Sequence, residues 1–156
     1  MEKNLSSFKL FLLLIVIINI QLASSLGIYL KLKIKIVKFD GDGTVDLIQK
    51  DENTISFTYK LKKGTWAGIG FGKSMENTDM HVVNAFTNGE FEVLDTYSFG
   101  HAPPSEDNSI GGTNNLKDIK KEQDLGDYII ISYSRLLDTN DQYDYVFKTV
   151  KLFNKL

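Results

Sequence analysis

Cysteine is absent from this 156-residue sequence. Its absence excludes disulfides, thiolate nucleophiles, cysteine-ligated zinc and covalently attached c-type haem. A domain built from this chain must therefore be held together by its core, for which 42% hydrophobic residues are sufficient. Histidine, proline and tryptophan are scarce, with two, two and one residues, and all of them fall between Gly64 and Asp107. Two of the three methionines lie in the same stretch, so candidate functional residues are concentrated there.

The sequence also lacks an excess of charge and any familiar catalytic motif. Its formal net charge is -2, without a basic cluster, which excludes nucleic acid as a partner. No nucleophile-elbow sequence accompanies His81 or His101, and the glycines at 68, 70 and 72 do not have dinucleotide-fingerprint spacing. A glycosidase-type carboxylate pair stays open, although most carboxylates fall in segments typical of turns. We therefore expect no bond-making catalysis by this chain.

Residues 1–25 have the composition of a signal peptide. Lys3 supplies a basic start, Phe8–Ile20 is almost wholly apolar, and Ala23 and Ser25 have the small-residue spacing that signal peptidase accepts. The alternative is a retained anchor, but the apolar run is shorter than the ~20 residues that span a bilayer. We expect cleavage after Ser25 and a secreted or lumenal domain over residues 26–156.

The remaining chain alternates apolar and polar residues with the period of two that is typical of strands. In residues 54–62, for example, Ile55, Phe57, Tyr59 and Leu61 are expected to face inward. Asn88-Gly89 predicts a hairpin with a type I′ turn, and Asp40–Gly43 is read as a plain turn rather than a calcium loop. No segment has helical periodicity. The sequence predicts one all-β domain, an antiparallel sandwich of about 8–10 strands. The expected strands are 28–37, 45–49, 54–62, 66–71, 80–86, 91–97, 116–121, 128–134 and 145–153.

Sulfur and imidazole side chains are grouped in the central stretch. Met75, Met80, His81 and His101 lie within one hairpin and its flanks. Thioether and imidazole together ligate low-spin b-type haem, and they also suit copper. The alternative is structural, because Met80 alternates with Val82 as a core residue would and a histidine at a strand edge is common.

The order of the motifs resembles the DOMON domain family over roughly residues 45–150. The motifs that carry the resemblance are Trp66–Gly72, Met75–Met80, Asn88-Gly89, Asp95–His101, Pro104, Asp107 and Arg135–Asp141. The resemblance implies an extracytoplasmic immunoglobulin-like β-sandwich. Some members bind haem b and transfer electrons, whereas others are thought to bind sugars or other small ligands.

The resemblance also implies which residues would form a site. Met75 occupies the position of the axial methionine. The family's second ligand is usually a histidine much nearer the C-terminus, but no histidine follows His101 in this sequence. His101 lies in a segment whose equivalent borders the pocket in haem-binding members, so it is the candidate substitute; His81 is the weaker candidate for haem iron. Trp66, Phe71 and Tyr97 are candidate pocket walls, with core positions as the alternative for the first two. Electron transfer would require a separate membrane or redox partner protein. The alternative function is a carbohydrate-binding or adhesive module that uses exposed aromatics such as Tyr97 and Phe99.

Overall fold

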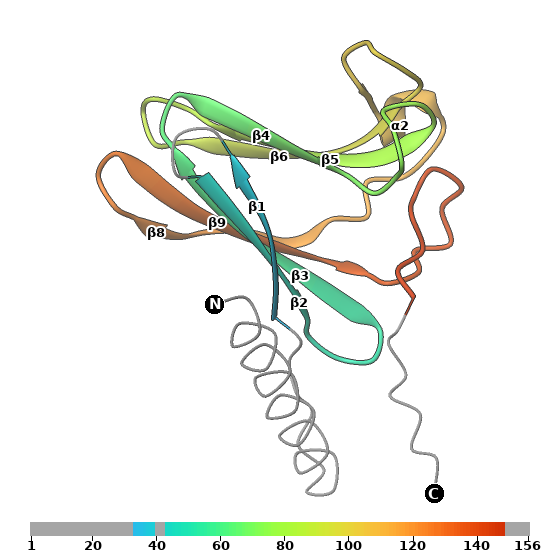
Figure 1. Cartoon of the computed structure of the whole chain (residues 1–156), viewed down its shortest axis with the longest axis horizontal. Coiled ribbons are helices and arrows are strands. Elements are labelled where there is room, and N and C mark those ends of the chain that lie inside the picture. Colours follow the sequence, from blue (N-terminus) through green and yellow to red (C-terminus); the bar gives the residue numbers. More distant parts are fainter. Residues whose placement is uncertain (1–32, 40–42, 149–156) are drawn as a thin grey trace, which may run out of the picture. The chain divides into compact units, whose positions relative to one another are not determined.

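The computed structural model describes residues 33–39 and 43–148 (Figure 1). Its regular structure is almost entirely strand, in the order β1 Lys33–Phe39, β2 Gly43–Gln49, β3 Thr54–Lys62, β4 Thr65–Gly70, β5 Thr78–Ala85, β6 Phe91–Ser98, β7 Ser105–Glu106, α2 Asp107–Ile110, β8 Lys117–Asp124 and β9 Tyr128–Leu136. Four sequence-based expectations fall wholly or partly outside the described residues. They are the signal peptide, the first part of the predicted 28–37 strand, most of the Asp40–Gly43 turn and the last part of the predicted 145–153 strand. Within the described ranges, no helix is long and apolar enough to cross a membrane.

The strands form two antiparallel sheets, which appear as two layers in Figure 1. Sheet A has the order β1-β2-β3-β9-β8, and sheet B has the order β4-β5-β6-β7. All their neighbouring strands pair antiparallel. The predicted all-β sandwich is confirmed.

The core lies between the inner faces of the two sheets and follows the predicted alternation. The four inward residues of β3 are each at most 8% exposed, as expected from the sequence. Phe57 of β3 stacks on Tyr133 of β9 with ring centroids 4.9 Å apart. Sheet B contributes Val83, Ala85 and Val93 to the same cluster. Burial of these apolar side chains is the main favourable term in folding.

The hairpin between β5 and β6 forms where Asn88-Gly89 predicted it, but its turn type differs. A type I′ turn requires positive φ at both central residues, whereas only Gly89 has positive φ, at 82°. The Gly89 amide donates to the carbonyl of Phe86 over 3.0 Å, and the Phe86 amide donates to the carbonyl of Glu90. The loop is therefore one residue longer, a type I turn that ends in a left-handed glycine.

The segment after β9 is not a strand between Tyr145 and Lys148, contrary to the prediction. The Tyr145 amide donates to Asp79 over 2.7 Å, and the Tyr145 carbonyl accepts from the Arg135 guanidinium. The N–H and C=O groups of Tyr145 thus bond to side chains and are not free to pair with a neighbouring strand. The stretch between the predicted strands 91–97 and 116–121 also contains two short elements that the sequence did not reveal, β7 and α2.

Candidate functional site

A group of charged side chains lies buried between the sheets. Asp79 and His81 belong to β5, Asp95 to β6 and Arg135 to β9. Each is at most 4% exposed, because each occupies a strand position whose alternation points inward. Asp107 of α2 and Asp144 of the segment after β9 complete the group. We call these six residues the buried charged cluster: Asp79, His81, Asp95, Asp107, Arg135 and Asp144.

Arg135 is the only cation at the centre of this cluster among the described residues. Its Nη1 donates to Asp79 Oδ2 over 2.7 Å and to Asp144 Oδ1 over 3.3 Å. Its Nη2 donates to the Tyr145 carbonyl, and the guanidinium carbon lies 4.9 Å from the centroid of the Phe147 ring. Arg135 thereby links β9, β5 and the segment that follows β9.

His81 is fully buried next to this guanidinium. Burial first, and Arg135 second, hold the pKa of His81 well below its usual range. The imidazole is therefore neutral, and its Nε2, 3.1 Å from Arg135 Nη1, accepts a hydrogen bond from the guanidinium. Its Nδ1 then donates to the Tyr133 hydroxyl over 2.9 Å. The hydrogen bonds thus assign the Nδ1–H tautomer.

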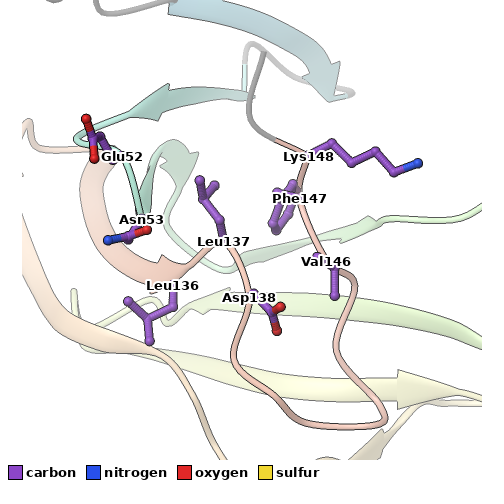
Figure 2. Close-up of a pocket in the computed structure, with 8 residues that line it drawn as sticks. All are labelled: Glu52, Asn53, Leu136, Leu137, Asp138, Val146, Phe147 and Lys148. Carbon is purple, nitrogen blue, oxygen red and sulfur yellow. The ribbon is translucent and has the colours of Figure 1, made fainter. Parts of the chain in front are cut away.

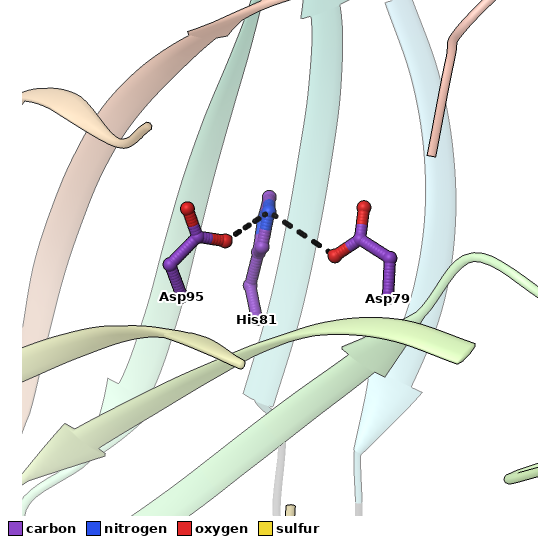
Figure 3. A group of neighbouring side chains, drawn as sticks. All are labelled: Asp79, His81 and Asp95. Atoms are coloured by element: carbon purple, nitrogen blue, oxygen red, sulfur yellow. Dashed lines mark ion pairs between the residues drawn. The ribbon is translucent and has the colours of Figure 1, made fainter. Parts of the chain in front are cut away.

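Asp79, His81 and Asp95 form one group with the composition of a metal site. Figure 3 shows the imidazole between the two carboxylates, with Nε2 3.6 Å from Asp95 and 4.0 Å from Asp79. Their ligand atoms lie within 4.8 Å of one another. Arg135 Nη1, however, already bonds Asp79 and contacts Nε2. A metal ion there would meet the guanidinium charge, so this half of the cluster is an ion pair.

Asp95, Asp107 and Asp144 form a second group, whose carboxylate atoms also lie within 4.8 Å of one another. Burial, together with repulsion from other carboxylates, raises the pKa of Asp95 and of Asp107 to about 7. At an effective dielectric constant of about 20, two ionised carboxylates 4.8 Å apart repel by about 3.5 kcal/mol. Fully ionised, the group would carry more negative charge than Arg135 balances, and the raised pKa values of Asp95 and Asp107 reflect this.

The predicted haem ligands lie in neighbouring loops. Met75, 39% exposed, is in the loop between β4 and β5. His101, also exposed, is in the loop between β6 and β7. Thr78 pairs with Ser98, so both loops leave the same end of sheet B, which we call the loop end.

The other predicted site residues are divided between three places. Tyr97 lies at the loop end, with its ring 5.0 Å from that of Phe99. Phe71 turns inward and packs edge-on against His81 at 4.9 Å. Trp66, 69% exposed, lies near the opposite end of β4. The structure thus groups Met75, His101 and Tyr97 at one end, places Phe71 at the same end of β4 with its ring turned into the core, and separates Trp66 from them.

Trp66 belongs to a row of side chains on the outer face of sheet B. It pairs with Asn84, and Asn84 pairs with Glu92, across three adjacent strands. The Asn84 amide donates to the Glu92 carboxylate over 3.0 Å. The indole lies along β4, since its Cζ3 atom would be 3.7 Å from a Cβ placed on Gly68. An exposed aromatic ring thus lies beside a hydrogen-bonded amide and carboxylate.

A cleft of about 590 Å³ lies at another place in the described structure, beside the start of β3 and the end of β9. Figure 2 shows Leu137 and Phe147 facing each other within it, while Lys148 extends away. Its remaining lining residues are Glu52, Asn53, Leu136, Asp138 and Val146. None of the site residues predicted from the sequence lines this cleft.

Sequence reasoning missed the buried charged cluster. It took most carboxylates for solvated turn residues, which is wrong for Asp79 and Asp107, and it gave no inward role to Asp95 within its predicted strand; all three are buried. A signal was present: Asp95 continues the inward phase of Val93, and Arg135 continues that of Ile131 and Tyr133. A charged residue in the apolar phase of a strand implies a buried partner.

The family of this chain follows from a match to a family model. Searches among curated proteins and among solved structures returned no match. The family model of the DOMON domain matches residues 44–154, which is most of the chain. The match includes every strand from β3 to β9 and all six residues of the buried charged cluster. This chain therefore belongs to the DOMON domain family.

Proposed function

We propose that this chain is a non-catalytic extracytoplasmic module that binds a small ligand at the loop end of sheet B. The observation that carries the proposal is the Thr78–Ser98 pairing, which brings the loops of Met75 and His101 out side by side. Both side chains are accessible to a ligand. Tyr97 and Phe99 add a pair of aromatic rings next to the same loops.

Haem b is the ligand that best fits this donor set. A thioether and an imidazole in neighbouring loops are the side chains that hold low-spin haem. Tyr97 and Phe99, whose ring planes are tilted by 67° to each other, offer one ring face to a planar macrocycle. Met75 and His101 would ligate the iron, and bound haem would supply one-electron chemistry. The polypeptide would bind and orient the haem. A separate redox partner protein would exchange electrons with it. Trp66, near the opposite end of β4, and Phe71, whose ring packs into the core, have no part in this proposal.

Haem uptake by the purified protein tests the proposal. Titration with haemin should give a 1:1 complex with a Soret band and, after reduction, sharp α and β bands. Met75→Leu and His101→Ala should each disturb the low-spin spectrum. Met80→Leu, a change of the same kind on β5, should leave it intact. A protein that remains colourless after addition of haemin would overturn haem binding, and unchanged spectra in both ligand variants would overturn the ligand assignment.

A carbohydrate-binding function is the second candidate, and the row on the outer face of sheet B favours it. The exposed face of Trp66 can stack against the apolar face of a sugar ring. Asn84 and Glu92, in the same row, offer amide and carboxylate groups to sugar hydroxyls. The site would then be a flat surface rather than a pocket.

Affinity electrophoresis in gels that contain soluble polysaccharides tests this second candidate. Retardation that Trp66→Ala abolishes would support the sheet-B face, whereas loss with Tyr97→Ala would assign sugar binding to the loop end instead. Phe86→Ala is the matched control, because Phe86 is 45% exposed and lies in the hairpin outside the row. A protein that no polysaccharide retards and no glycan array captures would contradict carbohydrate binding.

A further inference from the structure

The second carboxylate group, formed by Asp95, Asp107 and Asp144, has buried oxygen atoms that lack hydrogen-bond partners. Both Asp107 carboxylate oxygens are without a partner although the residue is only 1% exposed. Asp95 Oδ1 is also unpartnered, while its Oδ2 accepts the Asn115 amide over 2.8 Å. Buried carboxylate oxygens are normally satisfied by hydrogen bonds or by a metal ion.

The carboxylates of Asp95, Asp107 and Asp144 converge on one place. One carboxylate atom from each of the three residues lies within 4.8 Å of the others. Two oxygens that share a calcium ion at about 2.4 Å are at most about 4.8 Å apart, so the spacing suits one such ion. The three residues come from β6, α2 and the segment after β9, and no position in a single loop motif would reveal them together.

The charge of the surroundings also favours a cation. Four buried carboxylates, the three of this group and Asp79, face one guanidinium, that of Arg135. Arg135 bonds Asp79 and only one oxygen of Asp144. Asp107 has no contact with it that would balance its charge. The Asp107 side of the cluster is therefore the place where positive charge is lacking.

We propose that Asp95, Asp107 and Asp144 form a binding site for one calcium ion. Only oxygen ligands are present, which suits a hard cation rather than copper or zinc. Three carboxylates from separate segments provide a flexible, irregular shell, which calcium accepts more readily than magnesium does. The ion ties α2 and the segment after β9 to β6. This site differs from the loop-end site of Met75 and His101 and does not depend on it.

Calcium titration of the EDTA-treated full chain tests the site. Isothermal titration should give one calcium per chain, and the thermal midpoint should rise steadily with calcium concentration. Terbium should bind in place of calcium and luminesce through Tyr143, whose neighbour in sequence is Asp144. Added calcium should then quench that luminescence by displacement.

Asp107→Asn is the decisive variant, because it keeps the shape of the side chain and removes its charge. It should fold, bind calcium at least tenfold more weakly, and lose the calcium-dependent rise in thermal midpoint. Asp127→Asn, an exposed carboxylate in the β8–β9 turn, is the matched control and should bind as the wild type does. The absence of a thermal response and of stoichiometric binding at millimolar calcium would overturn the site. Undiminished binding by Asp107→Asn would overturn it equally.

Discussion

Replacement of Arg135 by methionine probes the buried charged cluster most directly. Methionine fills much of the same volume but leaves Asp79 and Asp144, at 2.7 and 3.3 Å from the lost nitrogen, without their cation. At an effective dielectric constant of about 20 these two attractions amount to about 6 and 5 kcal/mol before desolvation is subtracted. Removal of one partner from a buried pair typically costs 3–5 kcal/mol.

The loss has an upper bound that depends on pH. A stranded carboxylate can take up a proton, which at pH 7 costs about 4 kcal/mol for a group whose unfolded pKa is about 3.9. At pH 5 the same protonation costs about 1.5 kcal/mol. Arg135→Met strands two carboxylates, so the bound is about 8 kcal/mol at pH 7 and about 3 kcal/mol at pH 5. We therefore expect it to lower the free energy of unfolding by about 4 kcal/mol at pH 7, as is typical of a broken buried pair, and by at most about 3 kcal/mol at pH 5.

Urea unfolding of the two proteins at both pH values measures this difference. With an m-value of about 2 kcal/mol/M, the midpoint should fall by about 2 M at pH 7. Asp79→Asn should recover part of the loss in the Arg135→Met background, since it removes one stranded charge. An equal loss at pH 5 and pH 7, with no recovery in the double variant, would refute the electrostatic account of the cluster.

Three further predictions concern other parts of the same core. Tyr133→Phe removes the hydroxyl that partners His81 Nδ1, so it should lower the unfolding free energy by about 1–3 kcal/mol in urea titrations. His81→Gln should lose less stability, or gain more, than the wild type when the pH falls from 7.5 to 5.5. Burial lowers the pKa of His81, so its contribution is present above pH 6.5 and falls by up to about 1.4 kcal/mol per pH unit below it; unfolding curves of the two proteins at both pH values measure the difference. Gly72→Ala should cost about 1–3 kcal/mol, because its Cβ would lie 2.4 Å from Thr78 Oγ1, whereas Gly100→Ala meets nothing within 4 Å; equal midpoints for the two variants would contradict the packing argument.

The sequence predicts the strands of this domain better than its polar interior. Alternation of large apolar residues located β3 to the residue, since Ile55 to Leu61 can be buried only on one face of a strand. The same reasoning failed for Tyr145–Lys148, where Tyr145 and Phe147 alternate as in a strand. There Asp79 and Arg135 bind the backbone instead, and a local pattern contains no information about partners 66 and 10 residues away.

The candidate sites divide in the same way. Met75 and His101 stay predictions: they stand out in the sequence because sulfur and imidazole are rare in this chain, and the β5–β6 register gives their loops a common end. The carboxylates were not recognisable, because Asp residues are common in turns. Only the inward phase of Asp95 within β6 distinguished it from a solvated acid, and the partners of Asp107 depend on how distant segments meet.

Asp79 and Arg135 hydrogen-bond the backbone of Tyr145, and these two bonds have a consequence for the order of folding. The hydrogen bond between Asp79 and the Tyr145 amide joins residues 66 positions apart, and the Arg135–Asp79 bond joins residues 56 apart. Closing such long loops costs entropy before the contact stabilises anything. The hairpins β2–β3, β4–β5 and β5–β6 are closed by much shorter loops. We therefore expect the hairpins to form first and the segment after β9 to dock in the last step, when β5 and β9 have already been brought together.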